Sequence, residues 1–290
     1  MSEKKRNAII MAAGTSSRFV PLSVEYPKGL LEVRGEILIE RQIRQLMDAG
    51  VSDITVVTGY MADDFEYLKD KYCVNTVYNE DFNRYNNTSS MVRVLDRLSD
   101  TFVCSSDNYF PENVFLTDAS DSYYSAKYAE GHTGEYCLEC DADDIIKAVT
   151  VGGTDSWYMV GHVFFSDEFS REFAEILRRE YEKDGTRYGY WEDIYIRFID
   201  KLPKMKIRRY GESDIFEFDT LDELRQFDRS YINDTRSAVI KDIALKMNCR
   251  ESDLTCFCKV GQYGTHLQFT FMKNGRLYRY DGKDKTIEAL

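Results

Sequence analysis

The chain has 290 residues with 38 Lys and Arg against 50 Asp and Glu, so its formal net charge is −12 and its isoelectric point is about 4.9. This acidity argues against a nucleic-acid-binding protein, because a phosphate backbone requires a clustered basic surface. With 43% hydrophobic and 14% aromatic residues, the chain can fill a large core, which excludes global disorder. No apolar run reaches the roughly 18 residues of a membrane span, and no secretory signal follows the charged start. We therefore expect a cytoplasmic protein that is not inserted in a membrane.

The cysteines and histidines give little support for a zinc protein or a hydrolase. Seven cysteines, an odd number scattered through a large chain, are not a disulfide framework. Cys137 and Cys140 have the spacing of half a zinc site and His132 lies nearby, but a structural zinc site takes four ligands and no second pair follows. The three histidines belong to no motif of a Ser-His-Asp or Cys-His hydrolase.

Strand and helix patterns alternate through the first hundred residues. The apolar run at 8–11 ends in Ala-Ala-Gly, which is typical of a buried strand stopped by a turn. Residues 37–49 place apolar side chains at helical spacing, and Gly50 follows as a stop signal. The next predicted elements are a strand at 53–58, a helix at 62–72, a strand at 74–78, a helix at 89–98 and a strand at 101–105. This order predicts a doubly wound α/β fold with a parallel sheet.

The character of the chain changes near residue 230, after two later strands at 157–165 and 206–218 and a helix at 168–183. A polar joint at 230–234 is followed by a predicted helix at 237–247, strands at 256–260 and 266–272, a turn at Asn274-Gly275 and a strand at 277–280. We therefore predict two domains: residues 1–230 and a small helix–hairpin appendage at 231–290.

A phosphate-handling loop is predicted at residues 11–28, which read MAAGTSSRFVPLSVEYPK. Small side chains let successive backbone amides approach an anion, and five such residues follow the first strand: Ala12, Ala13, Gly14, Thr15 and Ser16. Arg18 adds a planar guanidinium group that can donate two hydrogen bonds to phosphate oxygens. The rigid Pro27 precedes Lys28 and fixes the backbone that presents it. The loop is neither a Walker A motif nor a dinucleotide fingerprint, since the glycine and lysine spacings of both are absent.

This loop resembles the signature of the nucleotidyltransferase superfamily, and the resemblance covers about residues 7–228. Within that superfamily the chain resembles the bacterial CTP:phosphocholine cytidylyltransferases of the LicC type. Three later stretches carry this resemblance: YNNTSS at 85–90, SDNY at 106–109, and YWED at 190–193 with EFD at 217–219. Where members usually have Gly-x-Gly before the arginine, this chain has Gly14-Thr15-Ser16. The resemblance implies a Rossmann-like, mixed but mostly parallel sheet with helices on both faces.

The implied reaction is attack by the phosphate oxygen of phosphocholine on the α-phosphorus of CTP, with release of pyrophosphate and with Mg²⁺ as cofactor. Both reactants are anions, so positioning and charge neutralisation supply most of the catalysis. The resemblance implies that Arg18 holds the β- and γ-phosphates, and that Lys28 holds the α-phosphate and the incoming phosphate. It also implies further nucleotide contacts from the loop residues 12–16 and from Asn87, Ser89 and Asp107.

Carboxylates for Mg²⁺ are expected at two places. Mg²⁺ needs one or two carboxylates and fills its other positions with water and phosphate oxygens. Asp107 follows an apolar strand, at the carboxyl end where ligands bind in such sheets. Asp219 is the matching late carboxylate, and Glu217 lies two residues earlier on the same strand face.

A choline site is expected at Tyr190, Trp191 and Glu192, with Tyr136 completing it. A trimethylammonium group cannot donate hydrogen bonds, so aromatic faces and a nearby carboxylate bind it. Aromatic clusters are also typical of a protein core, but here the tryptophan stands beside consecutive acids. Family members often carry tryptophan at the position of Tyr136.

The C-terminal segment resembles the opening of a choline-kinase-like lobe. Gly261 and Gly264 would form its loop, and residues 279–282 would end its second strand. Because a kinase catalytic loop is missing, we expect this segment to be inactive as a kinase. The competing interpretation is a small element that docks on the transferase or mediates a homodimer.

The sequence leaves two other functions open. One is a nucleotidyltransferase for a sugar phosphate or polyol phosphate, which would use hydrogen-bonding partners at the choline site. The other is a catalytically inactive, nucleotide-binding regulatory or scaffold protein. The joint presence of Arg18, Lys28, Asp107 and Asp219 favours an enzyme over the second.

Overall fold

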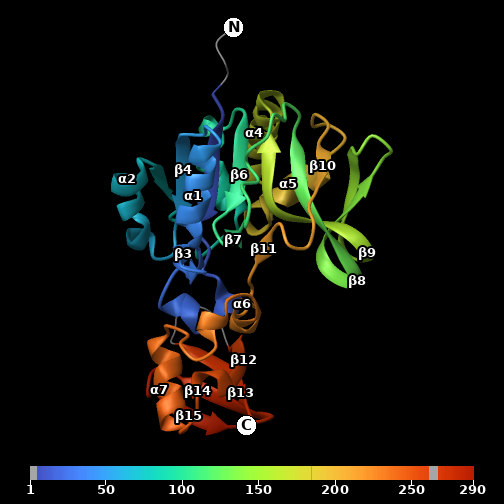
Figure 1. The fold of residues 1–290 in the computed structure, drawn as a ribbon. Coiled ribbons are helices and arrows are strands. Elements are labelled where there is room, and N and C mark those ends of the chain that lie inside the picture. Colours follow the sequence, from blue (N-terminus) through green and yellow to red (C-terminus); the bar gives the residue numbers. More distant parts are fainter. Residues whose placement is uncertain (1–4, 184, 261–266) are drawn as a thin grey trace. The chain divides into compact units, whose positions relative to one another are not determined.

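The computed structural model describes residues 5–183, 185–260 and 267–290 (Figure 1). The chain divides into two compact units. The first unit combines the chain up to Gly14 with Ile39–Glu217, and the second combines Thr15–Leu38 with Phe218–Leu290. These units do not follow the predicted boundary at residue 230, because the segment after Gly14 leaves the first unit and joins the C-terminal part of the chain. The extent of a 1–230 domain stays a prediction.

The first unit is built on a mixed sheet with the order β10-β8-β9-β6-β1-β4-β5. The parallel part consists of β1 (Asn7–Ala12), β4 (Asp53–Thr58), β5 (Asn75–Tyr78) and β6 (Thr101–Ser105). The antiparallel strand β9 (Ile146–Phe165) pairs with β6 and β8 (Tyr123–Cys140), and β10 (Lys206–Arg209) runs parallel to β8. The prediction of a mixed, mostly parallel sheet is confirmed.

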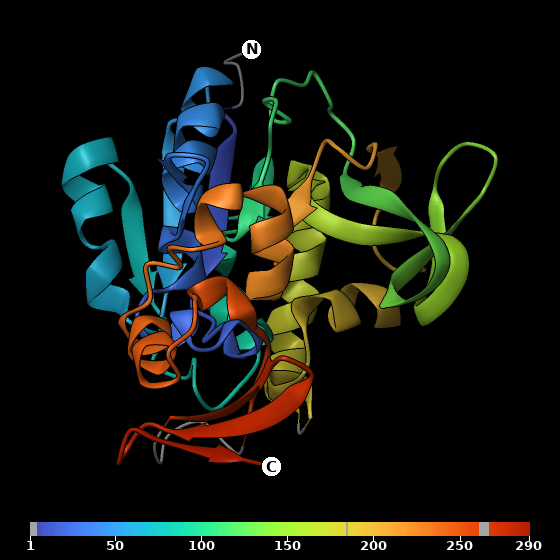
Figure 2. The same ribbon diagram turned by 60° about the horizontal axis from the view of Figure 1, so that its bottom comes forward.

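Helices cover both faces of this sheet. Ile9 and Ile10 point to opposite faces as neighbours on β1, and both are fully buried. On the face of Ile9, α4 (Asp167–Tyr181) and α5 (Trp191–Arg197) pack in one apolar cluster with β9, together with α3 (Thr88–Val92). Helix α1 (Leu38–Asp48) lies on the other face (Figures 1 and 2) and buries Ile39, Ile43 and Leu46.

Several predicted elements occur in altered form. The helix expected at 62–72 is a 3-10 turn η4 (Ala62–Phe65) followed by α2 (Tyr67–Tyr72), and the helix at 89–98 is α3 followed by η5 (Leu95–Arg97). The prediction of a single strand at 206–218 is wrong. A turn at Gly211–Asp214, closed by a 3.2 Å hydrogen bond between their backbones, separates β10 from β11 (Phe216–Glu217). Strand β11 then pairs with β7 (Asn108–Tyr109) in a second small sheet.

Strand β8 is absent from the predictions, although it forms a long pair with β9. Figure 2 shows the two strands extending beyond the rest of the sheet. Their register shifts at several points, and much of the outer half is exposed, so the regular apolar alternation of a strand is lost there.

The second unit begins with the phosphate-loop segment. Its short elements are η1 (Ser17–Phe19), η2 (Leu22–Val24), η3 (Lys28–Leu30), β2 (Glu32–Val33) and β3 (Glu36–Ile37). The C-terminal part adds α6 (Leu221–Phe227), η7 (Arg229–Tyr231), α7 (Ala238–Lys246) and η8 (Glu251–Asp253). The predicted helix at 237–247 is confirmed in α7.

The C-terminal sheet is antiparallel in the order β12-β13-β14-β15. Its strands are β12 (Leu254–Lys259), β13 (Gln268–Lys273), β14 (Arg276–Asp281) and β15 (Thr286–Ala289). The predicted turn at Asn274-Gly275 joins β13 to β14, and both residues have positive φ, as a tight hairpin requires. Strand β15 was not predicted. The predicted loop residues Gly261 and Gly264, and His266 at the start of the predicted strand 266–272, lie outside the described residues. Across the described ranges, no helix combines the length and apolarity needed to cross a membrane.

Candidate functional site

The predicted phosphate loop leaves β1 at Ala12. Ala12 and Ala13 are both buried, and the backbone amide of Tyr60 donates a 3.1 Å hydrogen bond to the carbonyl of Ala13. A Cβ built on Gly14 would meet nothing within 4 Å, so the packing of the protein itself does not require glycine there. Ser16 has φ 48° and ψ 46°, in the left-handed region. The loop therefore combines open space at Gly14 with an uncommon backbone conformation at Ser16.

Both predicted catalytic cations meet the same carboxylate within the second unit. Arg18 Nη1 lies 2.7 Å from Asp219 Oδ2, and Lys28 Nζ lies 3.5 Å from Asp219 Oδ1. The Lys28 side chain is 5% exposed, whereas that of Arg18 is 72% exposed. The Lys28 ammonium also lies 5.9 Å from the centre of the Phe19 ring. Lys28 is thus a fixed, buried charge, and Arg18 is an accessible one.

Asp107 follows β6 at the carboxyl end of the parallel strands, as predicted. The hydroxyl of Ser105 donates a 2.6 Å hydrogen bond to Asp107 Oδ1, which fixes the carboxylate beside the end of the strand. Glu217 pairs with Asn108 across β11 and β7, so its backbone lies next to the residue that follows Asp107. The first unit therefore brings Asp107 and Glu217 to one edge of the sheet.

A small pocket in the first unit contains Glu192; its lining includes Asn87, Ser105, Tyr124, Gly161, Trp191 and Glu192. We call it the Glu192 pocket. The Tyr124 hydroxyl donates to Glu192 Oε1 over 3.3 Å, and Asn87 Nδ2 lies 3.4 Å from Glu192 Oε2. Burial raises the pKa of Glu192 to about 7, although the hydrogen bonds from Asn87 and Tyr124 act in the opposite direction. The pocket thus holds a carboxyl group that changes its charge near neutral pH.

Trp191 belongs to the core of the first unit as well as to this pocket. Its side chain is 3% exposed and stacks on Tyr124 at 6.0 Å, while Phe165 and Phe173 approach it edge to face. Its backbone amide donates a 2.8 Å hydrogen bond to Asn87 Oδ1. These neighbours cover most of the ring, so Trp191 offers little open aromatic surface.

Tyr136 and Tyr190 form an edge-to-face pair whose ring centres are 6.3 Å apart. The Tyr136 hydroxyl donates a 3.0 Å hydrogen bond to Asp193 Oδ1, and the Tyr190 backbone amide donates to Asp193 Oδ2. Tyr190 is 46% exposed. The accessible aromatic surface near α5 therefore comes from Tyr190 rather than from Trp191.

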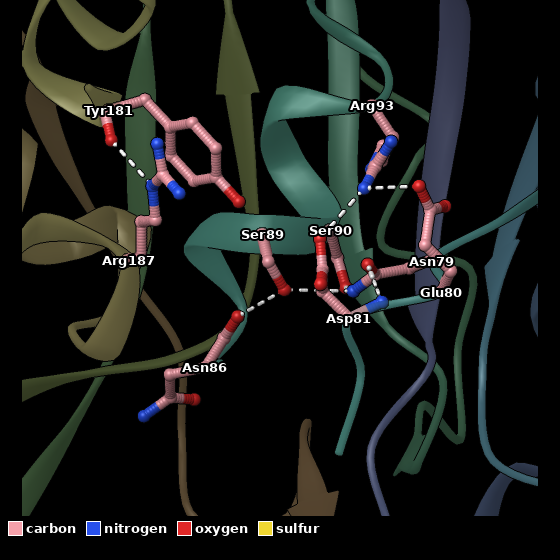
Figure 3. A network of polar contacts seen from close by, with 9 residues as sticks. All are labelled: Asn79, Glu80, Asp81, Asn86, Ser89, Ser90, Arg93, Tyr181 and Arg187. Carbon is pink, nitrogen blue, oxygen red and sulfur yellow. Dashed lines mark hydrogen bonds and ion pairs between the residues drawn. The ribbon is translucent and has the colours of Figure 1, made fainter. Parts of the chain in front are cut away.

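Ser89 takes part in a buried polar network (Figure 3). Asn79 Nδ2 donates to the hydroxyls of Ser89 and Ser90 over 2.8 and 2.9 Å, and Ser89 Oγ donates to the carbonyl of Asn86. Ser89 has no exposed surface. Its hydroxyl therefore holds the turn before α3, next to Asn87.

Sequence reasoning missed two residues of this region, Tyr124 and Asp193. Tyr124 lies on β8, which was not predicted, so no sequence signal connected it with Glu192. Asp193 was part of the quoted YWED stretch, but its contacts with Tyr136 and Tyr190 depend on the tertiary structure.

The donor chemistry fits Mg²⁺ bound through substrate phosphates. Among the residues that the structure describes, no group of three or more His, Cys, Asp or Glu side chains is placed to hold a metal ion. Mg²⁺ needs only one or two carboxylates when phosphate oxygens complete its shell. Asp107 and Asp219 are carboxylates of the required kind.

Comparisons with known proteins identify the family. Residues 8–129 match the MobA-like NTP transferase domain. The 2-aminoethylphosphonate cytidylyltransferase of Lancefieldella rimae is 35% identical over 238 residues, which cover 81% of this chain and 96% of that protein. The choline-phosphate cytidylyltransferase of Streptococcus pneumoniae is 30% identical over 227 residues, covering 78% and 99%. The chain belongs to the cytidylyltransferase family.

The fold agrees with this assignment. The solved structure of the CTP:phosphocholine cytidylyltransferase LicC from Streptococcus pneumoniae superposes with a TM-score of 0.75 at 29% identity, covering 78% of this chain and 99% of that one. The predicted resemblance to the LicC type is confirmed, and this cytidylyltransferase is a nucleotidyltransferase enzyme. The kinase-like resemblance of residues 231–290 stays a prediction.

Proposed function

We propose that this cytidylyltransferase transfers CMP from CTP to a small acceptor that joins a cationic amine to a phosphate or phosphonate, with release of pyrophosphate. The observation that carries the proposal is the Glu192 pocket, which places a carboxyl group between the Tyr124 hydroxyl and the Asn87 amide. A carboxylate in such a place suits a cationic head group. Relatives named for choline phosphate and for 2-aminoethylphosphonate support the same class of acceptor.

In the proposed reaction, an acceptor oxygen attacks the α-phosphorus of CTP and the bond to the pyrophosphate oxygen breaks. Lys28 neutralises the α-phosphate and the incoming anion, and its burial keeps its ammonium group in one place. Arg18, which is largely exposed, binds the β- and γ-phosphates through its planar fork. Both cations must exchange part of their contact with Asp219 for contacts with phosphate oxygens.

The nucleotide contacts are proposed for the loop residues 12–16 and for Asn87 and Asp107. The open space at Gly14 allows a phosphate to approach the backbone closely. Ser89 acts by positioning in this proposal, because its hydroxyl is buried and engaged by Asn79 and Asn86. When bound, Mg²⁺ supplies positive charge to the phosphates, and Asp107 and Asp219 are proposed to hold it, with Glu217 as a further candidate.

Phosphocholine is the acceptor that the sequence resemblance predicts. Glu192 would balance the charge of its quaternary ammonium, and Tyr190 and Tyr136 would offer aromatic surface. The contribution of Trp191 would be to shape the pocket, since its ring is covered by Tyr124, Phe165 and Phe173.

A second acceptor, 2-aminoethylphosphonate, is favoured by the polar lining of the Glu192 pocket. A primary ammonium group donates three hydrogen bonds, and the pocket offers oxygen atoms on Glu192, Tyr124 and Ser105. A trimethylammonium group has no N–H to donate to these oxygen atoms. The 35% identical relative is named for this phosphonate.

The experiment is a matrix of CTP and UTP against phosphocholine, 2-aminoethylphosphonate, phosphoethanolamine, glucose 1-phosphate and inositol phosphate, read as pyrophosphate release. We expect turnover with CTP and one of the three amine compounds. Turnover with a sugar phosphate or polyol phosphate alone would overturn the proposed acceptor class. Failure of every pair in folded protein would also overturn the proposed reaction.

A cytoplasmic location and a homodimer also stay predictions.

A further inference from the structure

The segment that carries both proposed catalytic cations is held by the C-terminal part of its own compact unit. Thr15–Leu38 and Phe218–Leu290 form one unit, and η1, which contains Arg18, packs against β12. The backbone amide of Arg34 also donates a 2.7 Å hydrogen bond to Asp228 Oδ2. The C-terminal part is therefore an integral neighbour of the phosphate-loop segment.

The first specific contact is made by Glu25, which lies between Arg18 and Lys28 in the sequence. The backbone amide of Ala238, the first residue of α7, donates a 2.7 Å hydrogen bond to Glu25 Oε1. Ser237 caps the same helix by accepting from the Ile240 amide over 3.1 Å. A carboxylate is favoured at a helix N-terminus by the exposed amides and the helix dipole. Glu25 thus fastens the segment to the start of α7.

The second contact is made at Glu32, four residues after Lys28. Its backbone carbonyl accepts two hydrogen bonds, one from the Tyr231 hydroxyl over 2.7 Å and one from Arg236 Nη1 over 2.9 Å. The Arg236 guanidinium lies 4.3 Å from the centre of the Tyr231 ring, and Tyr231 is 1% exposed. The two donors are therefore rigidly placed relative to each other.

These contacts lie on both sides of Lys28. Glu25 precedes it by three residues and Glu32 follows it by four, so the chain that presents the buried ammonium is fixed at both ends. A charged group that stabilises a transition state must be held in place, because a displacement of about 1 Å can lower the reaction rate roughly a hundredfold.

We propose that Tyr231, Arg236 and the start of α7, together called the C-terminal brace, position Lys28 and Arg18 for phosphate binding. Glu25 and Tyr231 are positioning residues in this account, not catalytic ones. The proposal rests on the proposed function, since it assigns the brace to the same phosphate-handling residues. It gives the C-terminal part a role in the transferase reaction that does not depend on any kinase activity.

The test uses the full chain with Glu25→Gln, Tyr231→Phe and the double variant. Glu25→Gln removes the charge at the helix start, and Tyr231→Phe removes one hydrogen bond while keeping the ring. Two matched controls lie in the same unit. Asp253→Asn changes another carboxylate that accepts a backbone amide, that of Arg250 over 3.0 Å, and Tyr278→Phe changes another tyrosine of the C-terminal sheet.

Two measurements are made well below the melting temperature of every variant. Amide hydrogen exchange in residues 15–38 of the ligand-free protein reports the fixation of the segment and needs no acceptor. Steady-state kinetics report kcat, the KM for CTP and, in the reverse direction, the KM for pyrophosphate.

We expect each single variant to speed exchange in residues 15–38 about fivefold and to lower kcat by a similar factor. A loss of this size is expected for one hydrogen bond, in Tyr231→Phe, or for a charge at a helix N-terminus, in Glu25→Gln. The KM for pyrophosphate should rise while the KM for the acceptor stays within about twofold. The controls should change neither exchange nor kcat, even where their melting temperatures fall equally. Unchanged exchange, or faster exchange with an unchanged kcat, would overturn the proposal. Wild-type protein without any turnover would refute the proposed function instead, and hydrogen exchange would still decide whether the brace fixes the segment.

Discussion

Asp219 forms an ion pair with Lys28, with 3.5 Å between Asp219 Oδ1 and Lys28 Nζ. The other oxygen of the same carboxylate lies 2.7 Å from Arg18 Nη1. One acidic side chain therefore contacts both proposed phosphate-binding cations. Asp219 also begins the turn into α6, where its backbone amide donates to Glu223 Oε2 over 2.7 Å. This backbone contact fixes the carboxylate independently of its charge.

Asp219→Asn should lower kcat by several orders of magnitude without unfolding the protein. The amide keeps the shape of the side chain but removes the negative charge proposed for Mg²⁺ and for the alignment of the two cations. The measurement is kcat over a range of magnesium concentrations, with Asp242→Asn as a control on the exposed face of α7. A near-normal kcat at ordinary magnesium levels would remove Asp219 from the proposed metal site. Asp107→Asn is expected to behave in the same way.

Lys28→Ala should lower kcat about a hundredfold to a thousandfold, as expected for the loss of a fixed charge that stabilises a transition state. The KM for CTP should change much less, because Arg18 still binds the outer phosphates and the charge of Lys28 matters most as the transition state develops. Steady-state kinetics with both substrates test this, and Lys246→Ala on the surface of α7 is the control. If the KM for CTP rises while kcat holds, Lys28 is a ground-state binder and its proposed role is wrong.

The parts of the fold that the sequence predicted are those with continuous local signals. Strands β4 and β6 occur at their predicted residues because short apolar, β-branched runs are bounded by polar turns. Strand β8 was missed because its outer half alternates Gly, Thr, Glu and His with few apolar residues, and pairing with β9 supplies its stability instead. Tyr124, the partner of Glu192, was missed with it.

The loop departs from the expected Gly-x-Gly pattern at Ser16. The resemblance to the superfamily predicts glycine at the position of Ser16, and Ser16 has a left-handed backbone, which glycine adopts without cost. The sequence showed the departure, but the conformation depends on how the loop enters η1. For Trp191 the sequence showed an aromatic residue beside acids, yet it could not show that Phe165 and Phe173 cover the ring.

Glu192 should make acceptor binding depend on pH. Its folded-state pKa is raised to about 7 by burial, so the carboxyl group is largely protonated below pH 7 and charged above it. The KM for the amine acceptor should therefore fall as the pH rises through 7, by up to about tenfold per pH unit on the acidic side. Glu192→Gln should abolish this dependence and raise the KM at pH 8. The variant also controls for titration of the acceptor itself, because that titration remains in both proteins.

The same raised pKa predicts an effect on stability. Between the unfolded pKa of 4.5 and the folded pKa of about 7, the folded state holds a proton that the unfolded state has lost. Stability relative to Glu192→Gln should therefore fall as the pH rises through this range. Thermal unfolding should show a higher melting temperature for Glu192→Gln at pH 8 and no advantage at pH 4. An equal difference at both values would mean that folding does not raise the pKa of Glu192.

Trp191 is a core aromatic residue, whereas the neighbouring Tyr190 is a surface one. Trp191→Leu removes a ring that is packed among Tyr124, Phe165 and Phe173, so it should lower the melting temperature by roughly 4–8 °C, at about 2 kcal/mol for a chain of this size. Affinity for CTP and for the acceptor should then decline together.

Tyr190→Leu is the better probe of the aromatic surface, since Tyr190 is 46% exposed. A cation–π contact at such an exposed site is worth about 0.5–1 kcal/mol, so the KM for phosphocholine should rise about twofold to fivefold with an unchanged KM for CTP. The matched control is Tyr188→Leu, a more exposed tyrosine that packs edge to face on Tyr85. Acceptors with a primary amine should lose less, because their ammonium group can hydrogen-bond to Glu192 and Tyr124. If Tyr190→Leu leaves the KM for phosphocholine unchanged while Glu192→Gln raises it, the carboxylate alone recognises the cation, and the aromatic part of the proposed site is wrong.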